Sequence, residues 1–146
     1  MAAFNPLDQF YTAAHEVECC LSNWKDMVQV SAGGIVIEPS AGAGAFSNKI
    51  EKCIAYDLEP KAAGIIEQDF LKLDFSQFEK REIHFIGNPP FGRNSKLVFK
   101  FIKQIVSYKY TASFSLIMPV SHKGNFYKNK INSIFTSFMN TTSMTL

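Results

Sequence analysis

The sequence predicts an α/β fold: a Rossmann-like, mostly parallel sheet of about five strands with helices on both faces. Short apolar runs alternate along the chain with stretches in which apolar residues recur at helical spacing. The loops that carry glycines, acids or an Asn-Pro pair follow the apolar runs, and ligands of such sheets bind at the carboxyl ends of the strands. The length of 146 residues suits one domain, and 47% hydrophobic residues can form its core.

The first elements are a helix and a buried strand. Residues 13–26 are expected to form the helix because four of them fall at helical spacing: Val17, Cys20, Leu21 and Trp24. Thr12 is the candidate N-cap of this helix. Gly33-Gly34 interrupts the helical pattern, and the apolar run at 35–37 is then expected to be a buried strand.

The middle of the chain repeats the alternation. A flexible loop at 38–44 is followed by an expected helix from Ala45. Residues 53–57 are expected to form the second strand, which an acid ends, and Pro60 to start a short helical turn. Residues 65–69 are expected to form a third, weaker strand, which also ends in an acid.

The last part of the chain carries two further strands and two helices. Residues 83–87 are expected to form the fourth strand, which runs into the tetrapeptide at 88–91. Apolar residues at helical register predict a helix over 95–108. Residues 112–118 are expected to form the fifth strand, and 124–138 a last helix.

The net charge of +2 hides a strong asymmetry along the chain. Residues 1–91 carry 7 Lys and Arg against 13 Asp and Glu, a net charge of −6, and residues 92–146 carry 8 Lys and Arg with no carboxylate, a net charge of +8. This division predicts one face for a small cationic or polar ligand and another for a polyanion. The alternative is ordinary solvation of one face by lysines.

The composition predicts an intracellular protein of the cytoplasm, the nucleoid or a host-cell compartment. No apolar run reaches the roughly 18 residues of a membrane span, and the N-terminus lacks the pattern of a secretory signal. The odd number of cysteines, without metal-ligand spacing, predicts reduced thiols and neither a zinc site nor a disulfide framework. His84 and His122 do not stand at a spacing that predicts a catalytic triad with an acid.

A glycine loop and two later acids together predict a pocket for an adenosine. Gly42 permits a tight turn after the first strand, and Gly44 lets the backbone approach a ligand. Asp57 ends the next strand, where its carboxylate can accept both hydroxyls of a ribose. Asp69 ends the third strand and can accept from an adenine amino group, and the neighbouring Phe70 can pack on the ring.

S-adenosylmethionine is favoured over a nicotinamide dinucleotide as the ligand of this pocket. The dinucleotide fingerprint is G-x-G-x-x-G, and its last position is Ser47 in this sequence. Glu38-Pro39 directly before the loop would repel a pyrophosphate, whereas a sulfonium and an ammonium are attracted by acids. The alternative for Asp57 and Asp69 is that each is a solvated loop acid.

The most specific signal is the tetrapeptide formed by Asn88, Pro89, Pro90 and Phe91. Two prolines fix the backbone, so the Asn88 amide oxygen and the Pro89 carbonyl can both point at one amine as acceptors. An amine on an aromatic ring is a poor nucleophile because its lone pair is delocalised. Two acceptors on its hydrogens favour a tetrahedral nitrogen that can attack a methyl sulfonium, and Phe91 offers a flat face for the ring. The alternative is a rigid proline turn with an Asn cap.

With these motifs the chain resembles the class I S-adenosylmethionine-dependent methyltransferases, and among them the DNA adenine-N6 methyltransferases. The resemblance runs over residues 5–122. Residues 8–12 (DQFYT) resemble the segment that precedes the cofactor strand, 38–44 resembles the cofactor loop, and 88–91 matches the catalytic motif. The order of these segments is that of the gamma arrangement.

The resemblance implies a set of site residues. Those that would bind the cofactor are Tyr11, Thr12, Glu38, Pro39, Ser40, Gly42, Gly44, Asp57, Leu58, Asp69, Phe70 and Asn88. The target base would be flipped out of DNA, or of RNA, into the pocket beside Asn88. Arg93, Lys96 and Lys123 would hold phosphates.

The resemblance also implies one methyltransferase domain, with an N-terminal segment and helix (1–30), a cofactor and catalytic core (31–122) and a C-terminal helix and tail (123–146). Members of the family usually continue through two more strands and often a target-recognition domain. A sheet that ends after the fifth strand would expose an edge, which predicts a homo-oligomer or a partner subunit that covers it. Such brevity would suit a compact viral or phage genome.

Several functions remain open at this point. N2-guanine in RNA and protein glutamine are alternative substrates, because motifs of the same kind serve them. A non-catalytic subunit that binds the cofactor or nucleic acid for a partner enzyme is a second class, and a nicotinamide-dependent oxidoreductase a third. Cytosine-C5 chemistry is disfavoured because Cys53 falls inside an expected strand and lacks a preceding proline.

Overall fold

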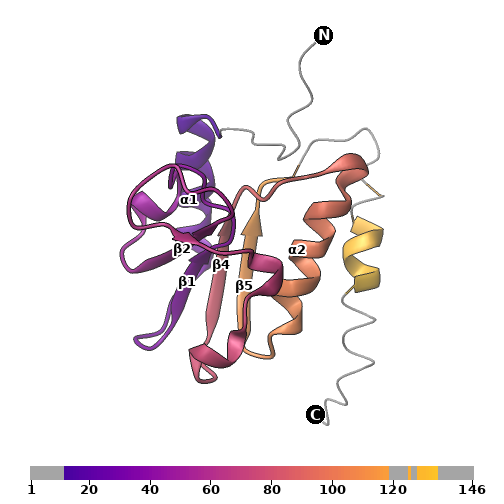
Figure 1. The fold of residues 1–146 in the computed structure, drawn as a ribbon. Helices are drawn as coiled ribbons and strands as arrows, with labels where there is room; N and C mark the ends of the chain where they lie inside the picture. Colours follow the sequence, from indigo (N-terminus) through magenta and orange to yellow (C-terminus); the bar gives the residue numbers. More distant parts are fainter. Residues whose placement is uncertain (1–11, 119–124, 126–127, 135–146) are drawn as a thin grey trace.

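In the computed structural model, which describes residues 12–118, 125 and 128–134, the chain folds around a five-stranded parallel sheet (Figure 1). The spatial order of the strands is β3-β2-β1-β4-β5. Their bounds are Ile35–Glu38 for β1, Cys53–Asp57 for β2, Ile66–Glu67 for β3, Ile83–Gly87 for β4 and Thr111–Leu116 for β5. The expected fold class, an α/β fold with a parallel sheet, is therefore confirmed.

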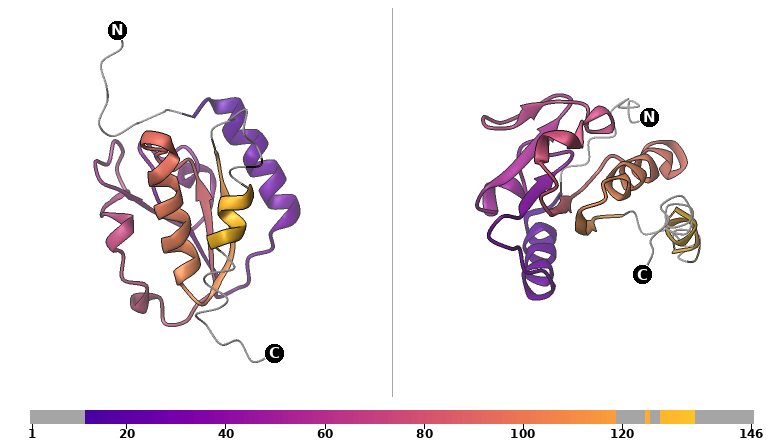
Figure 2. Two further views of the ribbon diagram at one scale, coloured as in Figure 1. Left: turned by 90° about the vertical axis from the view of Figure 1, so that its right-hand side faces the viewer. Right: turned by 90° about the horizontal axis from the view of Figure 1, so that it is seen from below.

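The two faces of the sheet are covered by different segments, as the two views of Figure 2 show. Helix α1 (Ala14–Met27) covers one face, and helix α2 (Lys96–Ser107) covers the other together with two 3₁₀ turns, η2 (Phe70–Lys72) and η3 (Phe75–Phe78). Successive side chains of β1 serve opposite faces: Ile35 and Ile37 pack on the α2 side, and Val36 on the α1 side.

Both helices are held mainly by their apolar stripes. Helix α1 buries Val17, Leu21 and Trp24 at the spacing that the sequence predicts. Helix α2 buries six residues, Val98, Phe99, Phe101, Ile102, Ile105 and Val106. Burying an aliphatic or Phe side chain fully stabilises the fold by about 1.5–3 kcal/mol, so α2 is the more strongly anchored of the two.

The helical residues 128–134 lie beside α2, and Ile131 lines a cavity together with residues of β5, so this helix also borders the β5 edge of the sheet (Figures 1 and 2). Ile134 is buried against Val98, Phe99 and Ile102 of α2. Residues 125 and 128–134 agree with the expected last helix, and the rest of the predicted range 124–138 lies outside the described residues.

The sequence mispredicted several local elements. The helix expected from Ala45 is only a 3₁₀ turn, η1 (Ser47–Lys49), because Ser47 N bonds to the Glu38 side chain, and Lys49 N and Ile50 N close i→i−3 bonds. Pro60 starts no helical turn, because Lys61 N bonds back to Gly42 O at 2.9 Å.

Three boundaries also differ from the prediction. The third strand is confined to β3, because Asp69 caps η2 through its carboxylate instead of ending a longer strand. The fifth strand ends at Leu116 rather than at 118. The N-cap of α1 is Ala13 rather than Thr12, whose hydroxyl is engaged elsewhere.

The strand order places a topological switch point between β1 and β4. From β1 the chain proceeds to β2 and β3 on one side, and it then crosses to β4 and β5 on the other. Loops that leave β1 and β4 therefore diverge, and a crevice for ligands opens beyond the carboxyl ends of these strands. The glycine loop follows β1 and the Asn88 tetrapeptide follows β4, so both lie at this crevice.

Candidate functional site

Gly87 lets the ends of β1 and β4 come close together at the switch point. A Cβ atom at Gly87 would lie 3.3 Å from Cγ of Glu38 and 3.6 Å from Cδ of Pro39. The contact is tighter than ordinary van der Waals packing, so a larger residue at this position would push the two strand ends apart. The site thus depends on Gly87, which the sequence analysis predicts only as the last residue of a strand.

The glycine loop is held in place by Asp57. Gly42 and Gly44 adopt left-handed conformations, with φ of +56° and +83°, that other residues reach only at a cost. Asp57 Oδ2 accepts from Gly42 N at 2.7 Å, and Asp57 Oδ1 accepts from Glu59 N at 2.8 Å. Each carboxylate oxygen can accept a second hydrogen bond, so Asp57 fixes the loop and keeps acceptor capacity for a ligand.

A cavity of about 180 Å³ lies beside this loop. Seven of the residues that line it belong to the predicted site: Pro39, Ser40, Asp57, Leu58, Asp69, Phe70 and Pro90. They come from the loops after β1, β2, β3 and β4. The structure therefore brings together the acids expected at the ribose and the adenine with one residue of the Asn88 tetrapeptide.

Asp69 and Phe70, the acid and the aromatic residue expected at the adenine, also have structural roles. Asp69 Oδ1 accepts from Leu71 N at 3.0 Å and so caps η2. Phe70 is 2% exposed, and its ring stacks on Phe101 with centroids 5.3 Å apart. Phe70 thus belongs to the core and meets the cavity as part of its wall, while Leu58, 54% exposed, lies at the mouth.

Asn88 is oriented by a hydrogen bond to a residue that lies 76 positions earlier in the sequence. Its Nδ2 donates to Thr12 Oγ1 at 2.9 Å, which ties the end of β4 to the residue before α1. Because the amide nitrogen faces Thr12, the amide oxygen lies on the other side of the group. Pro89 is fully buried, and Phe91 packs partly against the apolar cluster of α2. The tetrapeptide is therefore fixed at both ends.

A tight turn connects the tetrapeptide to α2. Gly92 has φ of +67°, and a Cβ there would lie 2.6 Å from Leu97 Cβ, so only glycine fits. The Phe91 carbonyl accepts from Leu97 N at 3.1 Å at the start of α2. Arg93 and Lys96 are exposed on this turn, as a role in phosphate contact requires. Tyr11 and Lys123, the other predicted contacts, lie outside the described residues.

Glu38 is the most buried acid of the site. It is 1% exposed, and its Oε2 accepts from Ser47 N at 2.7 Å. Burial, with the nearby negative charge of Asp57, raises the pKa of Glu38 from 4.5 to about 7, although the hydrogen bonds from Ser47 oppose this shift. Near neutral pH its charge will therefore respond to any cation that binds close by.

Cys53 lies next to Glu38 and is a poor nucleophile. Burial and the Glu38 carboxylate raise the pKa of its thiol to about 12, so the reactive thiolate is absent at neutral pH. Cysteine-based chemistry is thus not favoured at this site, in line with the expectation from its place in a strand.

The sequence reading missed four residues of the cavity: Gln68, Leu71, Leu97 and Phe101. Gln68 follows β3, and its Nε2 donates to Asp69 O at 3.0 Å. A signal for Gln68 was its position directly before Asp69 at a strand end. Leu97 and Phe101 stand four residues apart on α2, where their spacing predicts a helix and does not indicate a cavity, and Phe101 also belongs to the core.

A second polar cluster, around His84, lies away from the cavity. His84 Nδ1 is 2.8 Å from Ser113 Oγ, and Nε2 is 3.3 Å from Glu82 Oε1. Glu82 Oε1 also accepts from Ser31 N at 2.8 Å. The cluster links β4 to β5 and to the loop before β1. The sequence did not reveal it, because its members are far apart along the chain.

No family model, curated protein or solved structure matches the chain. Within residues 12–118, 125 and 128–134, no three His, Cys, Asp or Glu side chains form a group that could hold a metal ion. Over the same part of the chain, no helix has the length and apolar character to cross a membrane.

Proposed function

We propose that this chain transfers a methyl group from S-adenosylmethionine to an exocyclic amine, namely adenine N6 in DNA. One observation carries the proposal: a tetrapeptide with two acceptor groups and a glycine loop with acids meet at the switch point between β4 and β1. Pro90 lines the same cavity as Asp57 and Asp69, so the tetrapeptide and the pocket adjoin each other through this one residue, and the acceptors of Asn88 and Pro89 stand directly before it in the chain.

The cavity suits one end of the cofactor. Pockets that enclose a drug-sized ligand measure roughly 300–1,000 Å³, so a cavity of about 180 Å³ is too small for the whole cofactor and would receive one end of it. Apolar walls from Phe70, Leu71 and Leu97 fit a flat ring, and the carboxylates of Asp57 and Asp69 fit its hydroxyl and amino donors. The methionine end would lie along the glycine loop, near Glu38.

The bound cofactor would supply a methyl group on a positively charged sulfur. The residues of this chain would position the target amine and stabilise the charge that develops on its nitrogen. The Asn88 amide, oriented by Thr12, and the Pro89 carbonyl would accept the two amine hydrogens of the target. The nitrogen lone pair would then form the new N–C bond as the C–S bond breaks, and the amine would release one proton to solvent. Developing positive charge on the nitrogen would be stabilised by these fixed dipoles.

Two features favour a nucleic-acid substrate. Arg93 and Lys96 are exposed directly after the tetrapeptide, and Lys100 and Lys103 continue along the exposed side of α2. The whole of residues 92–146 contains no acid that would repel phosphate. A glutamine side chain as substrate would give these cations no role.

The test is incubation of the purified chain with S-adenosylmethionine and DNA, followed by mass spectrometry of the nucleosides. N6-methyladenine that appears with wild type and not with Asn88→Ala supports the proposal. Methylated guanine in RNA, or methylated glutamine in protein, would keep the reaction and replace the substrate. If S-adenosylhomocysteine does not bind in calorimetry and no methylated product forms, the proposal is wrong.

A further inference from the structure

The two edges of the sheet differ in how far they are protected from pairing. Strand β3 has only two residues, both exposed, and one of them is the charged Glu67. Strand β5 has six residues, is half-buried over most of its length, and carries no charge from Thr111 to Met118. Edge strands that stay single are usually short, charged or interrupted by proline. By these criteria β3 is protected, whereas β5 has no pairing strand on its outer edge among the residues that the structure describes and is bordered there by Ile131 of the helical residues 128–134.

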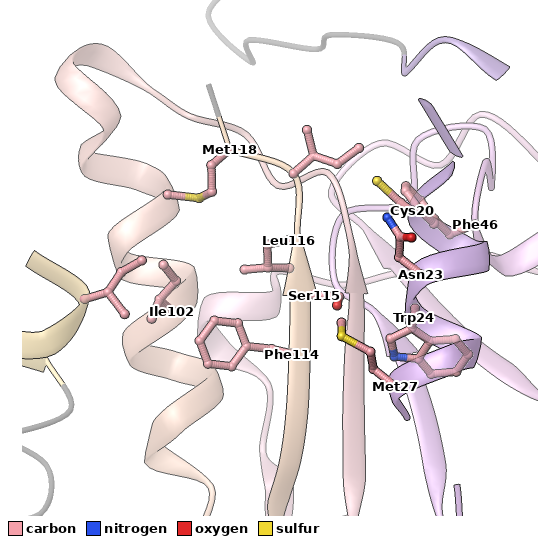
Figure 3. Close-up of a pocket in the computed structure, with 12 residues that line it drawn as sticks. Cys20, Asn23, Trp24, Met27, Phe46, Ile102, Phe114, Ser115, Leu116 and Met118 are labelled. Carbon is pink, nitrogen blue, oxygen red and sulfur yellow. The ribbon is translucent and has the colours of Figure 1, made fainter. Parts of the chain in front are cut away.

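A cavity of about 360 Å³ runs along the outer edge of β5. Five consecutive residues line it, from Phe114 to Met118, so it reaches both faces of the sheet. Figure 3 shows Ile102, Phe114, Leu116 and Met118 on one side of the strand and Cys20, Asn23, Trp24 and Met27 of α1 on the other. A small ligand would touch one face, whereas an added strand touches both.

Trp24 favours an occupant of this cavity that offers a hydrogen-bond acceptor. The residue is 5% exposed, and its Nε1 is buried without a hydrogen-bond partner among the described residues. In Figure 3 the indole nitrogen lies on the side of Met27 and Ser115. A buried donor left unsatisfied costs about 1–3 kcal/mol, so an occupant with an acceptor on the α1 side would be stabilised.

Strand β5 itself meets both requirements. On the α1 side it presents the hydroxyl of Ser115, and on the α2 side the apolar Phe114 and Leu116, whereas the hydroxyl of Ser113 is engaged by His84 of the same chain. Ile117 N donates to Gly87 O, so by strand alternation Leu116 turns its backbone N–H and C=O away from β4. These groups are therefore directed to the outer edge, where a further strand would pair.

We propose that the β5 edge binds the β5 edge of a second copy of this chain. A two-fold axis perpendicular to the sheet makes the two β5 strands antiparallel. It also places the α1 sides of the two copies on one face of the joined sheet and the α2 sides on the other. The hydroxyl of Ser115 of the second copy then comes to the α1 side, where it accepts from Trp24 Nε1. Phe114 and Leu116 of the two copies meet on the α2 side, as apolar cross-strand pairs that stabilise sheets.

Sedimentation velocity over a range of protein concentrations tests this interface. The wild-type chain is expected to dimerise. Trp24 is the only tryptophan, so its fluorescence should change with the same concentration midpoint. Ser115→Lys places a charge at the edge and is expected to raise the dissociation constant at least ten-fold. Ile66→Lys places the same charge at the β3 edge, where Ile66 is 49% exposed, and should leave the dimer intact.

A wild-type chain that stays monomeric at the highest concentration would overturn the proposal, and so would a Ser115→Lys variant that dimerises as tightly as wild type. Thermal melts establish that each variant is folded. If Ser115→Lys does not fold, Trp24→Phe decides: it keeps an aromatic ring at this position, loses the N–H, and should raise the dissociation constant about five-fold. An unchanged constant would remove Trp24 from the interface and contradict the proposal. The result does not depend on whether the chain methylates DNA.

Discussion

The two sides of the switch point handle charge in opposite ways. On the β1–β2 side, Glu38 and Asp57 are 1% and 7% exposed; Asp57 accepts from Gly42 N of the glycine loop, and Glu38 accepts from Ser47 N of η1. On the β4–α2 side, Arg93 and Lys96 stand exposed, and both belong to the acid-free part of the chain. Buried acids can act only on a ligand that enters the crevice, whereas exposed cations act on a ligand too large to enter it.

This comparison separates the roles expected for each side. The acid side should control binding of the small cofactor and the shape of the loop, and the basic side should control binding of a polyanion. Asn88 lies between them, at the end of β4 and in contact with Thr12. The variants below test whether the two sides are as independent as their structures indicate.

Asn88→Ala should have the largest effect, because it removes an acceptor from the reacting nitrogen. Loss of one oriented group of this kind reduces turnover by about 10²–10³-fold. Calorimetry with S-adenosylhomocysteine should show cofactor affinity within about two-fold of wild type. Asn94→Gly is the control, since Asn94 is exposed and has φ of 55°, a conformation that glycine adopts readily. Equal turnover by the Asn88 and Asn94 variants would contradict the assigned role.

Glu38→Gln should change the pH dependence of stability. Because the pKa of Glu38 is raised to about 7 in the folded chain, the folded state holds its proton longer than the unfolded state does. Its contribution is therefore most favourable below pH 4.5 and is lost as the pH rises toward 7. Between pH 5 and pH 8 the free energy of unfolding of the wild type should fall by roughly 2–3 kcal/mol more than that of the variant. Urea unfolding at the two pH values measures this difference, and parallel curves would show that Glu38 is not desolvated.

The sequence predicted the centre of the sheet well because β1 and β4 are fully buried and β2 is buried over its last three residues. β2 and β4 have the expected bounds, and the crevice follows from the alternation of strands and helices. It failed where hydrogen bonds between distant residues decide the local structure. The loop after β1 is held by Asp57, fifteen residues on, and Ser47 N bonds to Glu38, nine residues before it, so only the 3₁₀ turn η1 forms where a helix is expected from Ala45.

The site was predictable in its residue types and less so in its contacts. Strand ends in a parallel sheet converge, so Asp57 and Asp69 could be placed at one cavity from their positions alone. No local pattern links Thr12 to Asn88 or Trp24 to β5, because these contacts arise only when α1 packs on the sheet. Periodicity identifies which side of a helix is buried and does not identify its partner.

Asp57→Ala should weaken cofactor binding by about 1–3 kcal/mol, the cost of unpaired ribose hydroxyls. The variant also frees Gly42 N, so the loop itself should loosen. Calorimetry with S-adenosylhomocysteine measures the affinity, and proteolysis of the glycine loop measures its order. Glu59→Ala is the matched control, because Glu59 is an exposed acid two residues away. If both variants bind equally well, the acid side does not hold the cofactor.

Lys100→Ala should have the smallest effect and is the sharpest test of the basic side. A single exposed lysine that contacts phosphate contributes about 0.9 to the slope of log affinity against log salt concentration on duplex DNA. The variant should lower this slope by about that amount and leave the affinity for S-adenosylhomocysteine unchanged, because Lys100 lies on the exposed side of α2, outside the cavity. Lys52→Ala, which removes an exposed lysine from the turn before β2, should leave the slope unchanged. If both lysines contribute equally, binding is a property of net charge alone, and the distinction between an acid side and a basic side fails for polyanions.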